Sequence, residues 1–165
     1  MPDNGYAVII ALGSNLGDKQ KNIEETLDQI EERIGRINAL SSFHLTRPVG
    51  FESENIFVNC VCEVITKLDI YTVFAITKEI EYEAGRTKKS LNSLYADRII
   101  DIDLILAGDL VINTPELIIP HPRFHTRDFV LDPLCEIAPG MIHPLFGKTM
   151  LRLKEEIDQK QSELE

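Results

Sequence analysis

Asp101 and Asp103 are the two side chains whose types and spacing first suggest chemistry. They lie in a mostly apolar segment, residues 99–107, which we expect to form a strand. Since successive side chains of a strand point to opposite faces, both carboxylates should project from one face, ~7 Å apart. Ile102, Leu104 and Leu106 should then fill the other face. Magnesium is typically held by one or two carboxylates, with substrate phosphates as further ligands. The pair therefore predicts a divalent-cation site, and the alternative for an isolated Asp-x-Asp is the water-facing side of a strand.

A basic segment directly precedes this strand. Residues 86–98 contain four basic side chains and one acid, a local charge of +3 in a chain whose formal net charge is −10. The basic residues are Arg86, Lys88, Lys89 and Arg98. Guanidinium groups pair with phosphate oxygens, and metal-binding carboxylates complement them in nucleoside triphosphate sites. We expect a long polar loop that handles phosphate, with a solvated run of charges as the alternative.

Two further segments could bind anions or flat rings. Residues 121–129 contain two histidines, two arginines and two phenylalanines, but Pro122 and the lack of an intervening glutamate argue against a zinc-protease motif. Phe57 and Asn59 should share one face of a strand over residues 56–66, where a ring could stack on a heterocycle and an amide could bond its edge. An ordinary surface loop and a core aromatic beside a structural Asn are the respective alternatives.

Composition limits the possible partners and the location. The chain has 165 residues with 17 Lys+Arg against 27 Asp+Glu, which argues against general nucleic-acid binding. No apolar run reaches the ~18 residues of a membrane span, and the N-terminus lacks the pattern of a secretory signal. Three cysteines, an odd number, indicate free thiols in a reducing compartment. We therefore expect one cytoplasmic domain over residues 1–165, a monomer without nucleic-acid or membrane partners.

The pattern of apolar residues predicts the elements that position these groups. Strands are expected over residues 6–12, 37–46, 56–66 and 99–107, and Gly108 and Asp109 predict a hairpin turn into residues 110–112. Helices are expected before Gly35, over residues 70–84 with Asp69 as N-cap, and over residues 151–164. The prolines of residues 115–147 predict only short helices and turns there.

The order of these elements predicts an α+β fold. Strand, helix, strand, strand, helix and strand is the ferredoxin-like split βαβ arrangement, in which helices pack on one face of an antiparallel sheet. A hairpin and a C-terminal helix would be additions to it.

Taken together, the motifs resemble one family. They are Leu12-Gly-Ser-Asn-Leu16, Pro48-x-Gly50, Phe57-Val-Asn59, Gly85-Arg86, Arg98-Ile-Ile-Asp-Ile-Asp-Leu104, Pro120-His-Pro-Arg123 and Arg127-x-Phe-Val-Leu-x-Pro-Leu134. Their order is similar to that in the 6-hydroxymethyl-7,8-dihydropterin pyrophosphokinases. The resemblance implies transfer of the terminal diphosphate of ATP to the hydroxymethyl group of a reduced pterin, with AMP as the other product, in folate biosynthesis.

The resemblance also implies roles for individual residues. Asp101 and Asp103 would hold two magnesium ions, and Arg86 and Arg98 would neutralise charge on the transferred group. The residues implied for ATP are Lys88, Lys89, Arg98, His121 and Arg127. The residues implied for the pterin are Thr46, Pro48, Val49, Phe57, Asn59, Tyr95 and Phe129, with Phe57 and Phe129 as the rings on either side of it.

The chain departs from the family pattern in two places. Tyr95-Ala96-Asp97 stands where the family usually has an aromatic residue, Gly and Pro, and Glu116 stands where some members have a basic nucleotide contact. Two alternatives to the pyrophosphokinase remain at this point. They are a ferredoxin-like regulatory module that binds a small molecule, and a metal-dependent nucleotidyl- or glycosyltransferase.

Overall fold

The central element is an antiparallel sheet with strand order β2-β4-β1-β5, and β3 also pairs with β4. The computed structural model describes residues 4–46, 56–85 and 99–164. The strands are β1 (Tyr6–Ser14), β2 (Arg36–Leu40), β3 (His44–Thr46), β4 (Phe57–Thr66) and β5 (Asp101–Ala107). β1 lies between β4 and β5, and Val8, Ile9 and Ile10 are fully buried, as the uninterrupted apolar run predicts.

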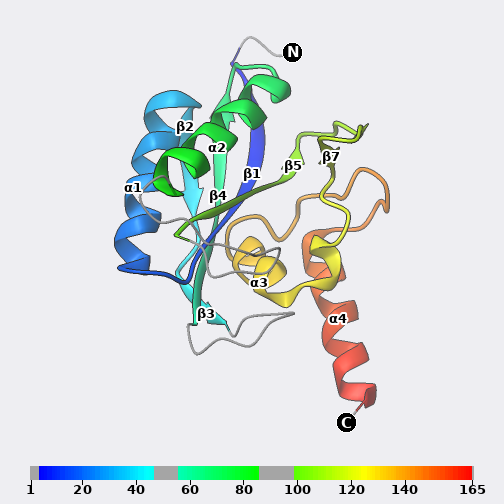
Figure 1. Cartoon of the computed structure of the whole chain (residues 1–165). Helices are drawn as coiled ribbons and strands as arrows, with labels where there is room; N and C mark the ends of the chain where they lie inside the picture. The colour runs from blue at the N-terminus through cyan, green and yellow to red at the C-terminus, as the bar shows by residue number, and fades with distance from the viewer. Residues whose placement is uncertain (1–3, 47–55, 86–98, 165) are drawn as a thin grey trace.

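Helices cover both faces of the sheet, whereas the sequence predicted them on one face (Figure 1). α1 (Lys19–Arg33) and α2 (Ile70–Gly85) pack on the face formed by Val8, Ile10 and Leu12. α3 (Asp128–Ile137) and α4 (Met150–Leu164) cover the face that contains Ile9 and Val61. The sequence did not predict this second layer, because the prolines of residues 115–147 indicated only short helices and turns. α3 nevertheless continues through Pro133. No helix in the described part of the chain is long and apolar enough to cross a membrane.

Two of the predicted strands differ in detail. The segment over residues 37–46 is divided into β2 and β3, because the Ser41 side-chain oxygen, in place of a backbone carbonyl, accepts the Val61 N–H at 2.9 Å. A hairpin is present, but it does not turn at Gly108 and Asp109 as predicted. β6 (Ile112–Asn113) pairs with β7 (Ile118–Ile119), while the Gly108 N–H donates to the Ala7 carbonyl.

Two residues were predicted to mark helix ends, Asp69 at the start of α2 and Gly35 after α1. The Asp69 carboxylate accepts the Tyr71 N–H at 2.8 Å and caps α2 as expected. Gly35 lies just past the end of α1, as expected, and it does not have a positive φ. A Cβ at Gly35 would lie 2.2 Å from the Ile65 carbonyl oxygen, so glycine is needed there for close approach of α1 to β4.

One end of the sheet brings together segments that are far apart in sequence. β1 ends there at Ser14, β5 begins at Asp101, β4 begins at Phe57 and β3 ends at Thr46. Side chains on the α3 face of this end therefore lie next to one another, and they include most of the described residues that the sequence singled out.

Candidate active site

Gly13 lies at the centre of this end of the sheet. It is paired with Asn59 of β4 on one side and with Asp101 of β5 on the other. A Cβ at Gly13 would lie 2.9 Å from Asn59 Oδ1 and 3.6 Å from Phe57 Cδ1. The missing side chain therefore leaves room for Asn59 to lie over β1. Gly13 is part of the motif Leu12-Gly-Ser-Asn-Leu16, but the sequence assigned it no role, because its importance depends on its two cross-strand neighbours.

Asn59 is held in one orientation. The side chain is buried, and its Nδ2 donates a hydrogen bond of 2.6 Å to Thr46 Oγ1 on β3. Thr46 is in turn paired with Phe57, so these three side chains share the α3 face. Val58, Cys60 and Cys62 lie in the core under α1 and α2, which confirms the predicted division of this strand.

Asp101 and Asp103 lie on the same face as Asn59, one strand beyond Gly13. Burial, followed by the neighbouring carboxylates of Asp101 and Glu81, raises the pKa of Asp103 to about 6. The opposite face carries Ile102 and Leu104, as predicted. Leu106 was expected there too and instead joins the core under α3, because the β1–β5 register shifts at Ile9 and Ile10.

Glu81 is a third carboxylate near this pair. Its Oε2 accepts the backbone N–H of Ile102 at 2.8 Å, and its Oε1 lies 3.1 Å from Lys78 Nζ. Burial raises the pKa of Glu81, against the opposing effects of the Ile102 N–H and Lys78. Sequence reasoning missed this residue, because Lys78 and Glu81 look like an ordinary ion pair on an exposed helix face.

The donor set fits magnesium. Two carboxylates on one face of a strand are a typical protein contribution to a magnesium site that phosphate oxygens complete. In the described residues no three His, Cys, Asp or Glu side chains converge as a complete metal site, so further ligands would come from substrate and water. Burial and, after it, repulsion by the neighbouring carboxylates raise the Asp103 pKa, and a bound cation would relieve that repulsion.

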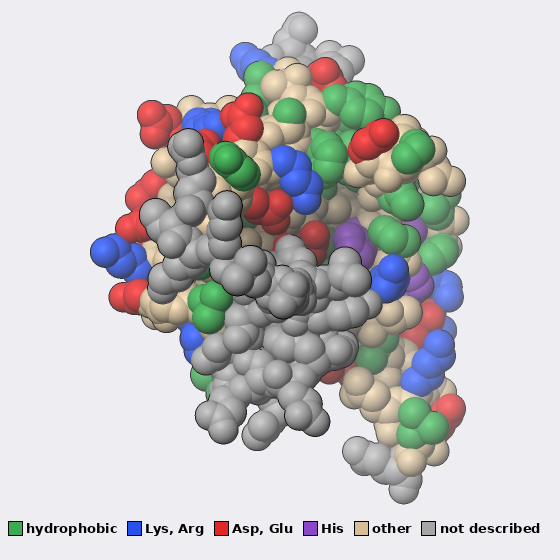
Figure 2. All heavy atoms as spheres, viewed as in Figure 1, with side chains coloured by type: hydrophobic (Ala, Val, Ile, Leu, Met, Phe, Trp, Pro, Cys, Tyr) green, Lys and Arg blue, Asp and Glu red, His purple; other side chains and the backbone are tan. Residues whose placement is uncertain are grey.

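His121 lies beside β5, and Arg127 immediately precedes α3. The His121 N–H donates to the Ile105 carbonyl of β5 at 2.9 Å, and His121 Nδ1 accepts the Arg123 N–H at 3.1 Å. The Arg127 guanidinium is 5.6 Å from the centre of the Phe129 ring. Its charge lowers the pKa of both His121 and Asp103, so the cation is close to both groups. On the face shown in Figure 2, acidic side chains lie near the middle with a histidine beside them.

The charge state of His121 gives a testable prediction. Burial and the charges of Arg127 and Arg123 lower its pKa to about 4. We expect the ring to stay neutral from pH 8 to 5.5, with its proton on Nε2. The folded-state pKa lies below the ordinary 6.5, so this group makes unfolding easier as the pH falls from about 6.5 toward 4. Histidine NMR titration, with His121→Gln identifying the resonance, measures this, and a midpoint near 6.5 would contradict it.

Seven of the predicted site residues lie outside the described residues. They are Pro48, Val49, Arg86, Lys88, Lys89, Tyr95 and Arg98. The structure brings together the remaining residues around one end of the sheet and along the start of α3. They are Thr46, Phe57, Asn59, Asp101, Asp103, His121, Arg127 and Phe129.

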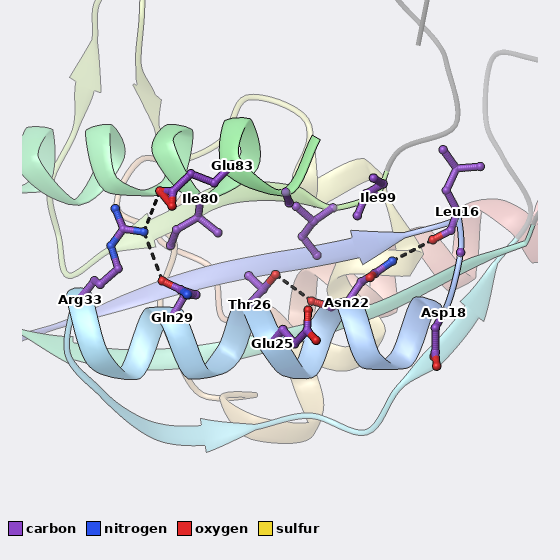
Figure 3. Close-up of a pocket in the computed structure, with 13 residues that line it drawn as sticks. Leu16, Asp18, Asn22, Glu25, Thr26, Gln29, Arg33, Ile80, Glu83 and Ile99 are labelled. Atoms are coloured by element: carbon purple, nitrogen blue, oxygen red, sulfur yellow. Dashed lines mark hydrogen bonds and ion pairs between the residues drawn. The ribbon is translucent and has the colours of Figure 1, made fainter. Parts of the chain in front are cut away.

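A cavity of about 440 Å³ lies elsewhere, between α1 and α2 on the opposite face of the sheet (Figure 3). Several of its polar lining groups already bond to one another or to backbone. Arg33 reaches both Gln29 and Glu83, Asn22 donates to the Leu16 carbonyl at 2.8 Å, and Thr26 donates to the Asn22 carbonyl at 2.8 Å. None of the predicted site residues is among the described residues that line it. We therefore do not place the chemistry there.

Comparisons with known proteins agree with the motif resemblance. Residues 9–139 match the family model described as 7,8-dihydro-6-hydroxymethylpterin-pyrophosphokinase. A 2-amino-4-hydroxy-6-hydroxymethyldihydropteridine pyrophosphokinase of Porphyromonas gingivalis is 43% identical over 138 residues, which cover 83% of this chain and 93% of that protein. The enzyme of the same name from Aquifex aeolicus is 36% identical over 149 residues, 90% of this chain and 91% of that protein.

Solved structures support the fold. The Plasmodium falciparum HPPK-DHPS crystallised with pterin and p-hydroxybenzoate matches with a TM-score of 0.78 and 17% sequence identity. The match covers 99% of this chain and 45% of that chain, so this chain spans less than half of the larger protein. The predicted α+β antiparallel fold with packed helices is confirmed. The chain belongs to the 7,8-dihydro-6-hydroxymethylpterin-pyrophosphokinase family and is a diphosphotransferase of folate biosynthesis.

Proposed function

We propose that this chain transfers the terminal diphosphate of ATP to the hydroxymethyl group of 6-hydroxymethyl-7,8-dihydropterin, releasing AMP, at the end of the sheet around Gly13. The single observation that carries the proposal is the row Asn59, Gly13 and Asp101 across three adjacent strands. It places a buried amide and a carboxylate pair on one face, two strand spacings or ~9.5 Å apart. A bicyclic pterin with its exocyclic carbon has a comparable length.

Asp101 and Asp103 are the proposed ligands of two magnesium ions. Bound magnesium would neutralise the phosphate oxygens and the charge that develops during transfer. The protein's own contribution is to hold both carboxylates on a rigid strand. Glu81 fixes the free edge of that strand through the Ile102 N–H, close to the first carboxylate.

The pterin pocket is proposed to form between β3, β4 and the start of α3. Asn59, oriented by Thr46, would bond the edge of the ring system, and Phe57 and Phe129 would stack on its two faces. Pro48, Val49 and Tyr95 complete the proposed pocket, as the resemblance to the family implies.

ATP is proposed to bind on the other side of the carboxylates. A neutral His121 would donate from Nε2, and Arg127 would pair with phosphate oxygens while its guanidinium lies near Phe129. The basic side chains of residues 86–98 would supply the remaining positive charge. They are Arg86, Lys88, Lys89 and Arg98.

Arg98 is expected to act on the rate more than on binding. We expect Arg98→Ala to lower kcat by about a hundredfold or more, because one cation aimed at developing charge is worth several kcal/mol in a transition state. The dissociation constant of the pterin should change by less than about threefold. Steady-state kinetics and pterin titration measure the two effects. Normal turnover with weakened pterin binding would refute this role.

The decisive experiment mixes the protein with magnesium, ATP and the hydroxymethyl-dihydropterin and separates the nucleotides. AMP and the pterin diphosphate are expected, and ADP as the only new nucleotide would refute diphosphate transfer. Family membership already decides against a purely regulatory module and against a nucleotidyl- or glycosyltransferase.

The organisation of the protein is also part of the proposal. We place the activity in a single domain over residues 1–165 that works as a monomer in the cytoplasm. Support for a reducing compartment comes from the thiols, since Cys60, Cys62 and Cys135 are all free. Gel filtration of the active enzyme tests the monomer.

A further inference from the structure

A polar cluster outside the reacting groups joins β3 to α3. We call it the β3–α3 clamp, and it consists of Ser42, His44 and Glu136. Glu136 Oε2 accepts the Ser42 N–H at 2.8 Å, Glu136 Oε1 accepts the Ser42 hydroxyl at 2.7 Å, and His44 Nε2 contacts Glu136 Oε1. Several contacts lower the pKa of Glu136, and the hydrogen bond from the Ser42 N–H has the largest effect. The carboxylate is therefore a bound anion that three donor groups hold in place.

The clamp does not have the arrangement of a nucleophile with its base. In a Ser-His-acid triad the acid bonds Nδ1 and the serine bonds Nε2, so that the ring relays a proton between them. Here the Ser42 hydroxyl and Glu136 both approach Nε2 of His44. The Ser42 hydroxyl therefore donates its hydrogen bond to the carboxylate and is not activated as a nucleophile.

The position of the clamp suggests a different role. His44 is paired with Asn59, and two residues later in the same short strand Thr46 accepts the hydrogen bond that orients Asn59. β3 pairs with β4 at three positions only. Glu136 lies on α3, whose first turn carries Phe129. The clamp thus connects β3, which orients the Asn59 amide, to α3, which carries the proposed stacking ring of Phe129.

We propose that Ser42, His44 and Glu136 are positioning residues for the pterin pocket, which fix β3 against α3 so that Thr46 holds the Asn59 amide. The inference rests on the proposed function, because it assigns the pocket to the pterin. The bonds that define the clamp run between β3 and α3, on either side of the proposed pterin pocket, so the three residues should affect recognition of the pterin and leave phosphate chemistry unchanged.

Glu136→Gln tests the clamp with little change in shape. One carboxylate oxygen becomes an amide nitrogen, which cannot accept a hydrogen bond, so the variant loses either the bond from the Ser42 N–H or the bonds from the Ser42 hydroxyl and His44. We expect the KM and dissociation constant of the pterin to rise about tenfold, which matches the loss of one or two hydrogen bonds, while kcat and the KM of ATP stay within twofold. Pterin fluorescence reports binding directly, since the chain contains no Trp.

Glu156→Gln is the matched control. Glu156 pairs with Lys148 Nζ at 2.6 Å. Glu156 lies within α4 and Lys148 just before it, away from the proposed pocket. The same chemical change there should leave both KM values unchanged. An equal effect of the two substitutions, or a fall in kcat with unchanged pterin KM for Glu136→Gln, overturns the proposal.

A double-mutant cycle with Thr46→Val tests the route. If the clamp acts through Thr46, the two substitutions weaken pterin binding by less than the product of their separate factors. If the two substitutions together weaken pterin binding by the full product of their separate factors, the clamp does not act through Thr46. Wild-type protein that binds no pterin overturns the proposed function and the clamp together, whereas normal wild-type binding with an unaffected Glu136→Gln variant overturns the clamp alone.

Discussion

Asp103→Asn is expected to abolish diphosphate transfer and at the same time to raise the melting temperature of the free protein. The activity should fall by at least about a thousandfold, because Asn cannot supply the anionic oxygen that would hold a magnesium ion. The fold should survive, since Asn has the same size and the strand stays paired with β1 at Ala11.

The rise in stability follows from the sign of the pKa shift. Burial and the nearby Asp101 and Glu81 raise the pKa of Asp103 from 3.8 to about 6. An acid with a raised folded-state pKa destabilises the fold as the pH increases from about 4 to 6, and the full penalty is present at neutral pH. Asn carries no charge and avoids this penalty. We expect a melting temperature a few degrees above wild type at pH 8, and a smaller difference at pH 5.

Differential scanning calorimetry at pH 8 and pH 5, with and without magnesium and ATP, measures the melting temperatures. The production of AMP measures the activity. Magnesium with ATP should raise the melting temperature of wild type and change that of Asp103→Asn much less. Asp28→Asn, an exposed change on α1, is the control and should alter neither activity nor the pH dependence. A variant that keeps normal AMP production would rule out Asp103 as a ligand.

Gly13→Ala should remove pterin binding while sparing ATP binding. The added Cβ would lie 2.9 Å from Asn59 Oδ1, closer than real Cβ contacts allow, and the facing amide is already bonded at 2.6 Å to Thr46. Asn59 must therefore swing out of its place. We expect the pterin dissociation constant to rise about a hundredfold, which corresponds to ~2.7 kcal/mol.

The strand itself should tolerate this change, because Ala costs less conformational entropy than Gly in a strand. Isothermal titration of the pterin and of a nonhydrolysable ATP analogue separates the two affinities. Gly140→Ala is the matched control, since nothing lies within 4 Å of the position of its added Cβ. Unchanged pterin affinity in Gly13→Ala would mean that the pocket does not lie over Gly13.

The parts of the site that the sequence predicted are those fixed by local periodicity. Alternation along a strand is enough to put Asp101 and Asp103 on one face and to separate Phe57 and Asn59 from Val58. The same rule failed for Leu106, because a bulge in β5 shifts the alternation and no sequence signal marked it.

What the sequence could not predict depends on contacts between distant segments. Gly13 matters only because Asn59 and Asp101 pair with it from two other strands. Glu136 is 94 residues from Ser42, and its role becomes visible only when α3 lies beside β3. The second helical layer was missed for a related reason, since α3 tolerates Pro133 once its buried face packs on the sheet.

The outer side of β5 has a consequence for solubility. β5 is an edge strand, and exposed edges invite pairing with other chains and hence aggregation. Here the Ile102 N–H is bonded to the Glu81 carboxylate, and the Ile105 carbonyl accepts the His121 N–H. A strand from another molecule would find both groups already bonded and would meet the half-buried carboxyl group of Glu81. The same carboxylate that lies beside the proposed metal ligands thus keeps this edge closed to fibril-like growth.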